Sequence, residues 1–202
     1  MRIIGLTGGS GAGKTAVSNC FQRFGAGSVN ADAVYRTLCS SCQPMLDALC
    51  TAFGNILTPM GQLDRPKLAA AVFADPAKLN ELNALTFPYI REASLSQMIE
   101  LSANGHAVIL YDAPTLFQTG ADSLCESVIG VIASRETRIA RIMARDGLSQ
   151  AAAAARIDAQ PDQAFYQAHC HYLIENDGSI PALEAQAQTV WAQIIKKGES
   201  PQ

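Results

Sequence analysis

Charged residues are scarce in this 202-residue chain: they make up 16% of it, against about 25% in an average soluble domain. There is also no surplus of positive charge, since fifteen Lys and Arg face eighteen Asp and Glu for a formal net charge of −3. A protein that coats nucleic acid is expected to carry a basic surplus. The composition therefore predicts no nucleic-acid partner, and a hydrophobic content of 49% excludes a disordered chain.

Long hydrophobic runs are missing as well. No stretch approaches the ~18 consecutive apolar residues of a membrane-spanning helix, so we expect no membrane partner. The segment Met1–Thr7 becomes glycine-rich too early for a secretory signal peptide, which predicts a cytoplasmic protein. In that compartment the six cysteines are expected to be reduced and buried. The alternative, a zinc site on Cys39 and Cys42, would need two more ligands, and only Cys50 lies nearby.

Short apolar runs alternate with helical patterns along the chain. The runs predict five strands, at 2–6, 28–30, 107–111, 127–132 and 171–174. Helical patterns follow the first strand to about residue 24 and then cover 32–52, 65–103 with breaks at Pro76 and Pro88, 135–145, 149–168 and 179–197. Continuous apolar strands between helices predict an α/β fold of three layers, with a five-stranded parallel sheet buried on both faces. The long gap between the second and third strands predicts a helical insertion at the carboxyl edge of that sheet.

A glycine-rich loop follows the first strand. Its pattern, Gly8-x-x-x-x-Gly13-Lys14-Thr15, stands between a strand and a helix, which is the context of a P-loop. Glycines let successive backbone N–H groups converge on phosphate oxygens, and the helix start adds the positive end of its dipole. Lys14 reaches the β- and γ-phosphates of ATP, and Thr15 places its hydroxyl on Mg²⁺. The predicted nucleotide-binding residues here are Gly9, Ser10, Gly11, Ala12, Gly13, Lys14 and Thr15.

A P-loop predicts nucleotide binding without specifying a reaction. GTPase switches carry an Asn-Lys-x-Asp motif late in the chain, and none occurs here. Mechanical ATPases usually need partners or a longer chain. These absences favour a kinase of a small molecule.

Two acids end strands near the loop. Asp32 follows the second strand, at the edge where open α/β sheets bind substrates. It is either a general base that accepts the proton of an attacking hydroxyl or the N-cap of the next helix, and both roles are compatible with the sequence. Asp112 ends the third strand and suits the acid that holds Mg²⁺ directly or through water. The alternative for Asp112 is a solvated strand-end acid.

Four arginines, at positions 135, 138, 141 and 145, lie on one predicted helix. At about 100° per residue they cover an arc of roughly 120°. Four guanidinium groups on one face repel each other unless an anionic group faces them. An isolated run of charged residues is usually a solvated surface. Beside a P-loop the face instead indicates a helix that closes over ATP, and Arg156 in the next helix can join it.

The ordered set of these segments resembles the dephospho-CoA kinase family, P-loop kinases of the nucleoside-monophosphate-kinase type. The similarity extends from Ile3 to about Asn176. The segments that carry it are 4–15, Asn30-Ala31-Asp32, Leu63-Asp64-Arg65 with Val72-Phe73, 112–117 with Gly120, 138–149, 156–160 and 174–179.

That resemblance implies that ATP with Mg²⁺ phosphorylates the ribose 3′-hydroxyl of dephospho-CoA, giving CoA and ADP in the last step of CoA biosynthesis. It implies catalytic roles for Asp32, Lys14 and Arg145, and nucleotide binding by Arg141, Arg145 and Asn176 besides the loop. It also implies one P-loop kinase domain, 1–202, with a helical acceptor subdomain at 32–103 and a lid at about 138–168. A monomer is favoured. The alternatives are a kinase of another small nucleotide or alcohol, and a nucleotide-binding relative without catalysis.

Several positions depart from the family pattern. Asn30 stands where the family usually has Asp, Phe87 where it has His, and Gln118 where it has Glu. Tyr166 replaces a frequent basic residue. The first three changes each remove a titratable group near the acceptor side, so Asp32 is left as the one acid of the usual pair that can act as a base.

Overall fold

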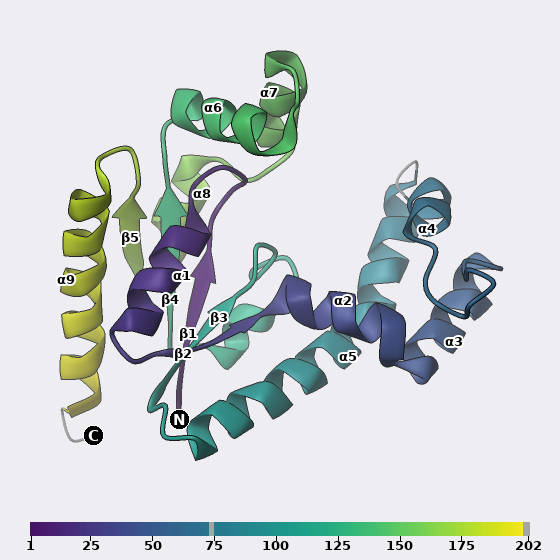
Figure 1. Ribbon diagram of the computed structural model, residues 1–202, viewed down its shortest axis with the longest axis horizontal. Coiled ribbons are helices and arrows are strands. Elements are labelled where there is room, and N and C mark those ends of the chain that lie inside the picture. Colours follow the sequence, from purple (N-terminus) through teal and green to yellow (C-terminus); the bar gives the residue numbers. More distant parts are fainter. Residues whose placement is uncertain (73–74, 200–202) are drawn as a thin grey trace. The chain divides into compact units, whose positions relative to one another are not determined.

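The computed structural model describes residues 1–72 and 75–199, in which five strands form one all-parallel sheet (Figure 1). The strands are β1 (Arg2–Thr7), β2 (Gly27–Asn30), β3 (Val108–Asp112), β4 (Ser127–Ile132) and β5 (Tyr172–Glu175). Their order across the sheet is β2-β3-β1-β4-β5, so β1 lies in the centre. Each predicted strand is confirmed to within one residue at either end.

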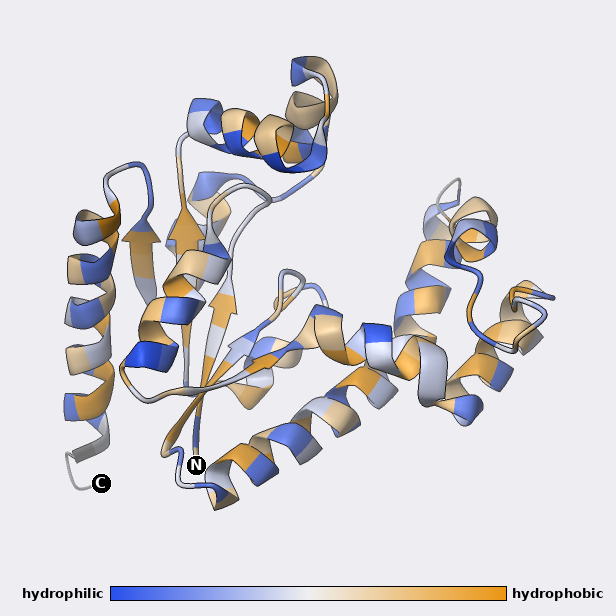
Figure 2. Ribbon diagram, viewed as in Figure 1, coloured by the Kyte–Doolittle hydropathy of each residue, from blue (hydrophilic) through white to orange (hydrophobic). Residues whose placement is uncertain are grey.

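The sheet is covered by helices on both sides, as the apolar strands predicted. Every residue of β3 and β4 is buried. The core around the sheet joins strand residues such as Leu6 and Ile129 to Phe21 of helix α1 (Lys14–Arg23) and Ile194 of helix α9 (Ile180–Glu199). Figure 2 shows the consequence, with hydrophobic strands inside and mixed hydropathy along the helices.

The remaining helices differ from the prediction at three places. They are α2 (Ala31–Ser41), α3 (Gln43–Phe53), α4 (Arg65–Val72), α5 (Pro76–Ala103), the short 3₁₀ helix η1 (Ala121–Leu124), α6 (Arg135–Asp146), α7 (Gln150–Asp158) and α8 (Gln163–His169). The helical stretch expected at 32–52 is confirmed except at Cys42, where the chain leaves helical geometry and α3 begins with a proline in its first turn. The helical stretch expected at 149–168 is likewise interrupted, since Asp162 begins a new helix by accepting the Phe165 N–H at 2.9 Å.

The third difference concerns Pro88. A break was expected there, because proline removes a backbone N–H and crowds the preceding turn. Instead, α5 runs through Pro88 without interruption, whereas the break before Pro76 is confirmed. Phe73 and residues 200–202 lie outside the described residues.

The described chain divides into two units. One consists of Met1–Ser28 and Leu101–Gln202 and contains the sheet core. The other, Val29–Glu100, is helical and has its own core, to which Met45, Leu49 and Val72 contribute. Both bounds of the second unit lie three residues before those of the predicted insertion at 32–103. Its role in acceptor binding remains a prediction.

The cysteines form no disulfide: all six are described and all are free thiols. Cys20 and Cys39 are buried and the other four are half-buried, so the expected burial is confirmed for two of the six. In the part of the chain that the structure describes, no three His, Cys, Asp or Glu side chains gather as a metal site would require. That same part contains no helix with the length and apolarity needed to cross a bilayer.

Candidate active site

The P-loop occupies the turn between β1 and α1. Gly8, Gly11 and Gly13 have φ of 151°, 78° and 92°, values that favour glycine, and Gly13 is the N-cap of α1. The Lys14 side chain folds back over the turn, and its Nζ donates to the Gly8 carbonyl oxygen at 3.1 Å. The loop therefore has the curled backbone that the sequence predicted, with the lysine amine held at its entrance.

Asp112 lies beside the start of this loop. It ends β3 in register with Leu6 of β1, and the next residue, Ala113, donates its N–H to the Leu6 carbonyl at 3.1 Å. The Asp112 side chain is buried, so the alternative of a solvated strand-end acid is wrong. Its carboxylate and the Thr15 hydroxyl are hard oxygen donors, the kind that Mg²⁺ takes from a protein while phosphate and water complete its shell. The donor set thus fits this ion.

Helix α6 packs directly against the outer side of the P-loop. A Cβ placed on Gly11 would lie 2.6 Å from the Arg138 carbonyl oxygen, and one on Gly9 would collide with the Arg138 guanidinium. A Cβ on Gly13 would collide with the Asn176 amide. The loop glycines are therefore required by the protein on the outer side as well as by a phosphate on the inner side.

Arg138 holds the first half of the loop. Its Nε donates to the Ser10 carbonyl at 2.9 Å, and its Nη2 donates to Gln160 Oε1 at 3.0 Å. The same Gln160 oxygen accepts the Ser10 N–H at 2.8 Å. Arg138 is 9% exposed, and this burial lowers the pKa of its guanidinium. Both backbone groups of Ser10, a predicted nucleotide-binding residue, are thus engaged by the protein.

Arg141 and Asn176 hold the second half. Asn176 Nδ2 donates to the Ala12 carbonyl at 2.8 Å, and Arg141 Nη2 donates to the Asn176 carbonyl at 2.8 Å. Arg141 Nη1 also lies 3.3 Å from the Gly11 carbonyl. Both residues were predicted to bind nucleotide; the structure places them at the P-loop, on its carbonyl oxygens.

The other arginines of this region pair with carboxylates. Arg135 contacts Asp158 at 2.9 Å, and Arg145 binds both oxygens of Asp146 at 2.8 Å each. Arg156 meets the same Asp146 at 2.5 Å. Hydrogen bonds from Arg145, and then from Arg156, lower the pKa of Asp146 to about 2.

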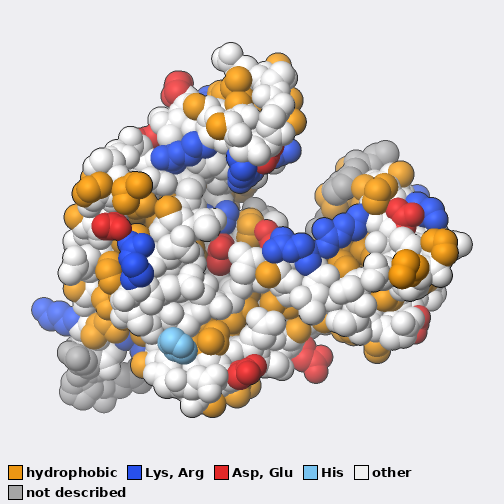
Figure 3. All heavy atoms as spheres, in the orientation of Figure 1, with side chains coloured by type: hydrophobic (Ala, Val, Ile, Leu, Met, Phe, Trp, Pro, Cys, Tyr) orange, Lys and Arg blue, Asp and Glu red, His pale blue; other side chains and the backbone are white. Residues whose placement is uncertain are grey.

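The arginine face predicted to turn to ATP is therefore divided. Arg138 and Arg141 bond to neutral oxygens at the loop, whereas Arg135 and Arg145 bond to acids. Figure 3 shows blue Lys and Arg side chains gathered along α6. The network of Arg138, Gln160 and Ser10 was missed by the sequence analysis, although Gln160 ends one of the segments that carried the resemblance.

Asp32 lies in the first turn of α2, in the helical unit, and is exposed. The N-cap of that helix is Asn30, whose Oδ1 accepts the Ala33 N–H at 2.8 Å. The alternative that Asp32 is the cap is therefore wrong. The substitution of Asn for the family's usual Asp at position 30 places a good capping side chain there.

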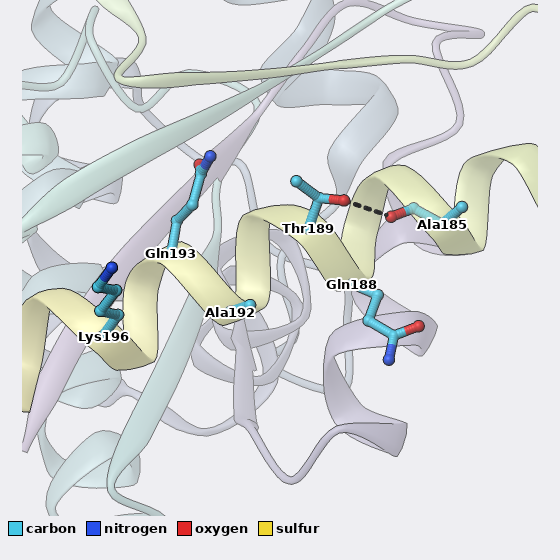
Figure 4. A pocket seen from close by; sticks show the side chains of 6 residues that line it. All are labelled: Ala185, Gln188, Thr189, Ala192, Gln193 and Lys196. Carbon is cyan, nitrogen blue, oxygen red and sulfur yellow. Dashed lines mark hydrogen bonds between the residues drawn. The ribbon is translucent and has the colours of Figure 1, made fainter.

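A pocket on α9 does not belong to this site. Its lining comes from one helix only: Ala185, Gln188, Thr189, Ala192, Gln193 and Lys196 (Figure 4). The Thr189 hydroxyl donates within the helix, to the Ala185 carbonyl at 2.9 Å. None of the predicted site residues lines it.

Comparison with known proteins identifies the family. A family model described as dephospho-CoA kinase matches residues 2–182. A protein of Anaeromyxobacter dehalogenans named dephospho-CoA kinase is 38% identical over 195 residues, covering 96% of this chain and 92% of the relative. The structure of a dephospho-CoA kinase from Campylobacter jejuni superposes with a TM-score of 0.71 at 27% identity, over 98% of this chain and 100% of the other. A shikimate kinase from Acinetobacter baumannii shares the fold, with a TM-score of 0.53 at 17% identity and coverage of 99% and 96%. The chain, with its P-loop kinase fold, thus belongs to the dephospho-CoA kinase family.

Proposed function

We propose that the chain transfers the γ-phosphoryl group of ATP to the ribose 3′-hydroxyl of dephospho-CoA, which yields CoA and ADP and completes CoA biosynthesis. The observation that carries this function is the family match over residues 2–182 of a chain that keeps Lys14, Thr15, Asp32, Asp112 and Arg145. Nucleotide binding alone would require neither a base nor a lid arginine.

The P-loop binds the triphosphate of ATP. Backbone N–H groups of the segment 9–15 meet the phosphate oxygens, apart from those of Ser10 and Ala12, which donate to Gln160 and to the Gly9 carbonyl. The positive end of the α1 dipole lies behind them. Lys14 is held at the mouth of the loop and places its charge by the β- and γ-phosphates. Thr15 and Asp112 would hold Mg²⁺, which when bound neutralises charge on the phosphates.

Asp32 accepts the proton of the attacking 3′-hydroxyl. Its carboxylate is exposed at the start of α2 and is not used to cap that helix. The helical segment 32–103 then serves as the acceptor subdomain, which brings dephospho-CoA to the base. A group placed in this way typically contributes about 10²–10⁴-fold to the rate.

The segment of about 138–168 acts as the lid. Its helices α6 and α7 share a small core of Ile142, Ala153 and Ile157, separate from the core of the sheet. Arg145 at the end of α6 is oriented by Asp146 and is largely exposed. Because Asp146 also pairs with Arg156, two guanidinium groups share one carboxylate, and a net positive charge is left for phosphate oxygens when the lid binds ATP. There it stabilises charge that moves from the γ- to the β-phosphate during transfer.

The partners that follow from this function are ATP and dephospho-CoA. We assign neither nucleic acid nor membrane to the protein, and we place it in the cytoplasm as a monomer.

A coupled assay of ADP release tests the function, with dephospho-CoA and then other nucleotides and alcohols as acceptors. We expect transfer to dephospho-CoA, detected as CoA by chromatography, and none with Lys14→Ala. Folded protein that binds ATP but transfers phosphate to none of these acceptors would contradict the proposal. Preference for a different acceptor would support the alternative kinase.

A further inference from the structure

Arg138 is a buried cation without an anionic partner in the described protein. It forms no ion pair among residues 1–72 and 75–199, and its hydrogen bonds go to the Ser10 carbonyl and the Gln160 amide oxygen. Burying an unpaired charge is costly, and buried charges are usually paired. An arginine nevertheless stays protonated at neutral pH. The charge of Arg138 is thus retained at a cost to stability.

The nearby carboxylate does not remove this charge. Asp158 is the carboxylate whose negative charge acts on Arg138, but it forms an ion pair with Arg135 at 2.9 Å. Arg135 adds a positive charge and Asp158 a negative one, so the pair largely cancels. Tyr166, the other titratable group that acts on Arg138, is buried, and burial raises its pKa above the ordinary value of 10.0, so it carries no charge at neutral pH.

The Arg138 guanidinium lies against the P-loop, the segment proposed to bind phosphate. The guanidinium touches the position of Gly9 so closely that a methyl group there would collide with it. In a poorly solvated site a charge acts over several ångströms. A triphosphate in the P-loop is the kind of anion that complements it.

Gln160 completes this arrangement with a neutral oxygen. Its Oε1 atom accepts from Arg138 Nη2 at 3.0 Å and from the Ser10 N–H at 2.8 Å, which fixes the guanidinium relative to the loop. A carboxylate would accept both bonds equally well, and Asp146 does so for Arg145 and Arg156. A carboxylate, however, would neutralise the charge that the loop can offer to a ligand.

We propose that Gln160 is a positioning residue of the ATP site: it orients Arg138 against the P-loop through a neutral amide oxygen and thereby keeps the arginine charge available to the phosphates. This proposal rests on the function proposed above only in taking ATP as the ligand. It therefore concerns binding and is tested without an acceptor.

The substitution Gln160→Glu separates orientation from charge. Glutamate has the length of glutamine and can accept the same two bonds, but it adds a negative charge beside Arg138. We expect calorimetry to show a Kd for ATP raised about tenfold, a smaller rise for ADP, and an unchanged or higher Tm. Gln163→Glu adds the same charge on an exposed residue at the start of α8 and is the matched control. We expect it to change both Kd values by less than about twofold.

Two results would overturn the proposal: an ATP affinity of Gln160→Glu equal to that of Gln163→Glu, or equal losses for ATP and ADP, which would indicate a structural role only. If Gln160→Glu does not fold, Arg138→Gln decides, because it removes the charge and keeps a polar side chain. An ATP-selective loss supports the proposal, and wild-type ATP affinity overturns it. Protein that binds ATP as expected here but shows no transfer would contradict the proposed function alone.

Discussion

Asn30 Oδ1 accepts the backbone N–H of Ala33 at 2.8 Å and is thereby the cap of α2, two residues before Asp32. The first turn of a helix favours a carboxylate through the dipole, so Asp32 sits in a compatible place without being needed to begin the helix. The helix cap and the proposed base are thus two neighbouring side chains, and each can be changed separately.

Replacing Asp32 by Asn is expected to lower kcat by about 10²–10⁴-fold, because the base for the 3′-hydroxyl is lost. The Kd for ATP is expected to stay near the wild-type value, since the P-loop lies in the other unit. The Tm should change little. Steady-state kinetics, calorimetry and thermal denaturation measure the three quantities.

Asn30→Ala is the control, with the reverse pattern: a free energy of unfolding lower by about 1 kcal/mol from the lost cap. An unchanged kcat in Asp32→Asn would remove Asp32 from the catalytic role.

The sequence predicted the sheet well because its strands are continuous apolar runs with glycine or polar residues at their ends. The helix breaks were harder. Pro44 and Pro161 mark two real breaks, whereas Pro88 lies within an uninterrupted helix. The effect of a proline depends on whether neighbouring groups can satisfy the freed carbonyl, and that is a tertiary property.

Gly9→Ala and Gly11→Ala test the contact between α6 and the P-loop. Gly9 has a φ open to any residue, and its added methyl would meet the guanidinium of Arg138, a side-chain end that can shift at the cost of its hydrogen bonds. We therefore expect a fold that is kept, with Tm lower by a few degrees and weaker ATP binding. Gly11 has a φ of 78°, and its methyl would meet the backbone of α6 at 2.6 Å. We expect a larger loss, about 3 kcal/mol or more.

Gly105→Ala serves as the control for these variants. Its φ is 96°, and a Cβ there would have nothing within 4 Å, so it measures the backbone cost alone. Equal losses in unfolding free energy for Gly11→Ala and Gly105→Ala would show that α6 does not press on the loop.

The sequence predicted which residues of the site carry the chemistry. It did not predict which groups the arginines of α6 bind. Motif spacing indicated Lys14, Thr15 and Asp112, because local strand–loop–helix geometry places them. Helical periodicity put four arginines on one face, but it could not tell that Arg138 and Arg141 would bind P-loop carbonyls while Arg145 binds Asp146. The contacts of Arg138 and Arg141 join segments about 20 to 130 residues apart, whereas Asp146 is the sequence neighbour of Arg145.

Asp146 predicts a pH dependence. Its folded-state pKa is about 2, below the ordinary value of 3.8, because Arg145 and Arg156 bond to its charged form. The stabilisation that it gives is therefore present above about pH 4 and is lost as the pH falls towards 2. We expect the protection factors of the α7 amides against hydrogen exchange to decrease over this range.

Asp146→Asn should remove that part of the pH dependence, because its amide does not titrate. Exchange in α9, which does not touch Asp146, provides the internal reference. Identical pH profiles of α7 in the wild type and in Asp146→Asn would contradict the prediction.

The central position of β1 has a consequence for synthesis of the chain. This strand is synthesised before its neighbours β3 and β4, which begin only at Val108 and Ser127. At a synthesis rate of about 5–20 residues per second, the apolar side chains of β1 lack these neighbouring strands for on the order of 5–20 s. The helical unit Val29–Glu100 has its own core and can pack during that interval. We therefore expect the nascent chain to fold its middle before its beginning, with β1 as the segment most in need of chaperone protection.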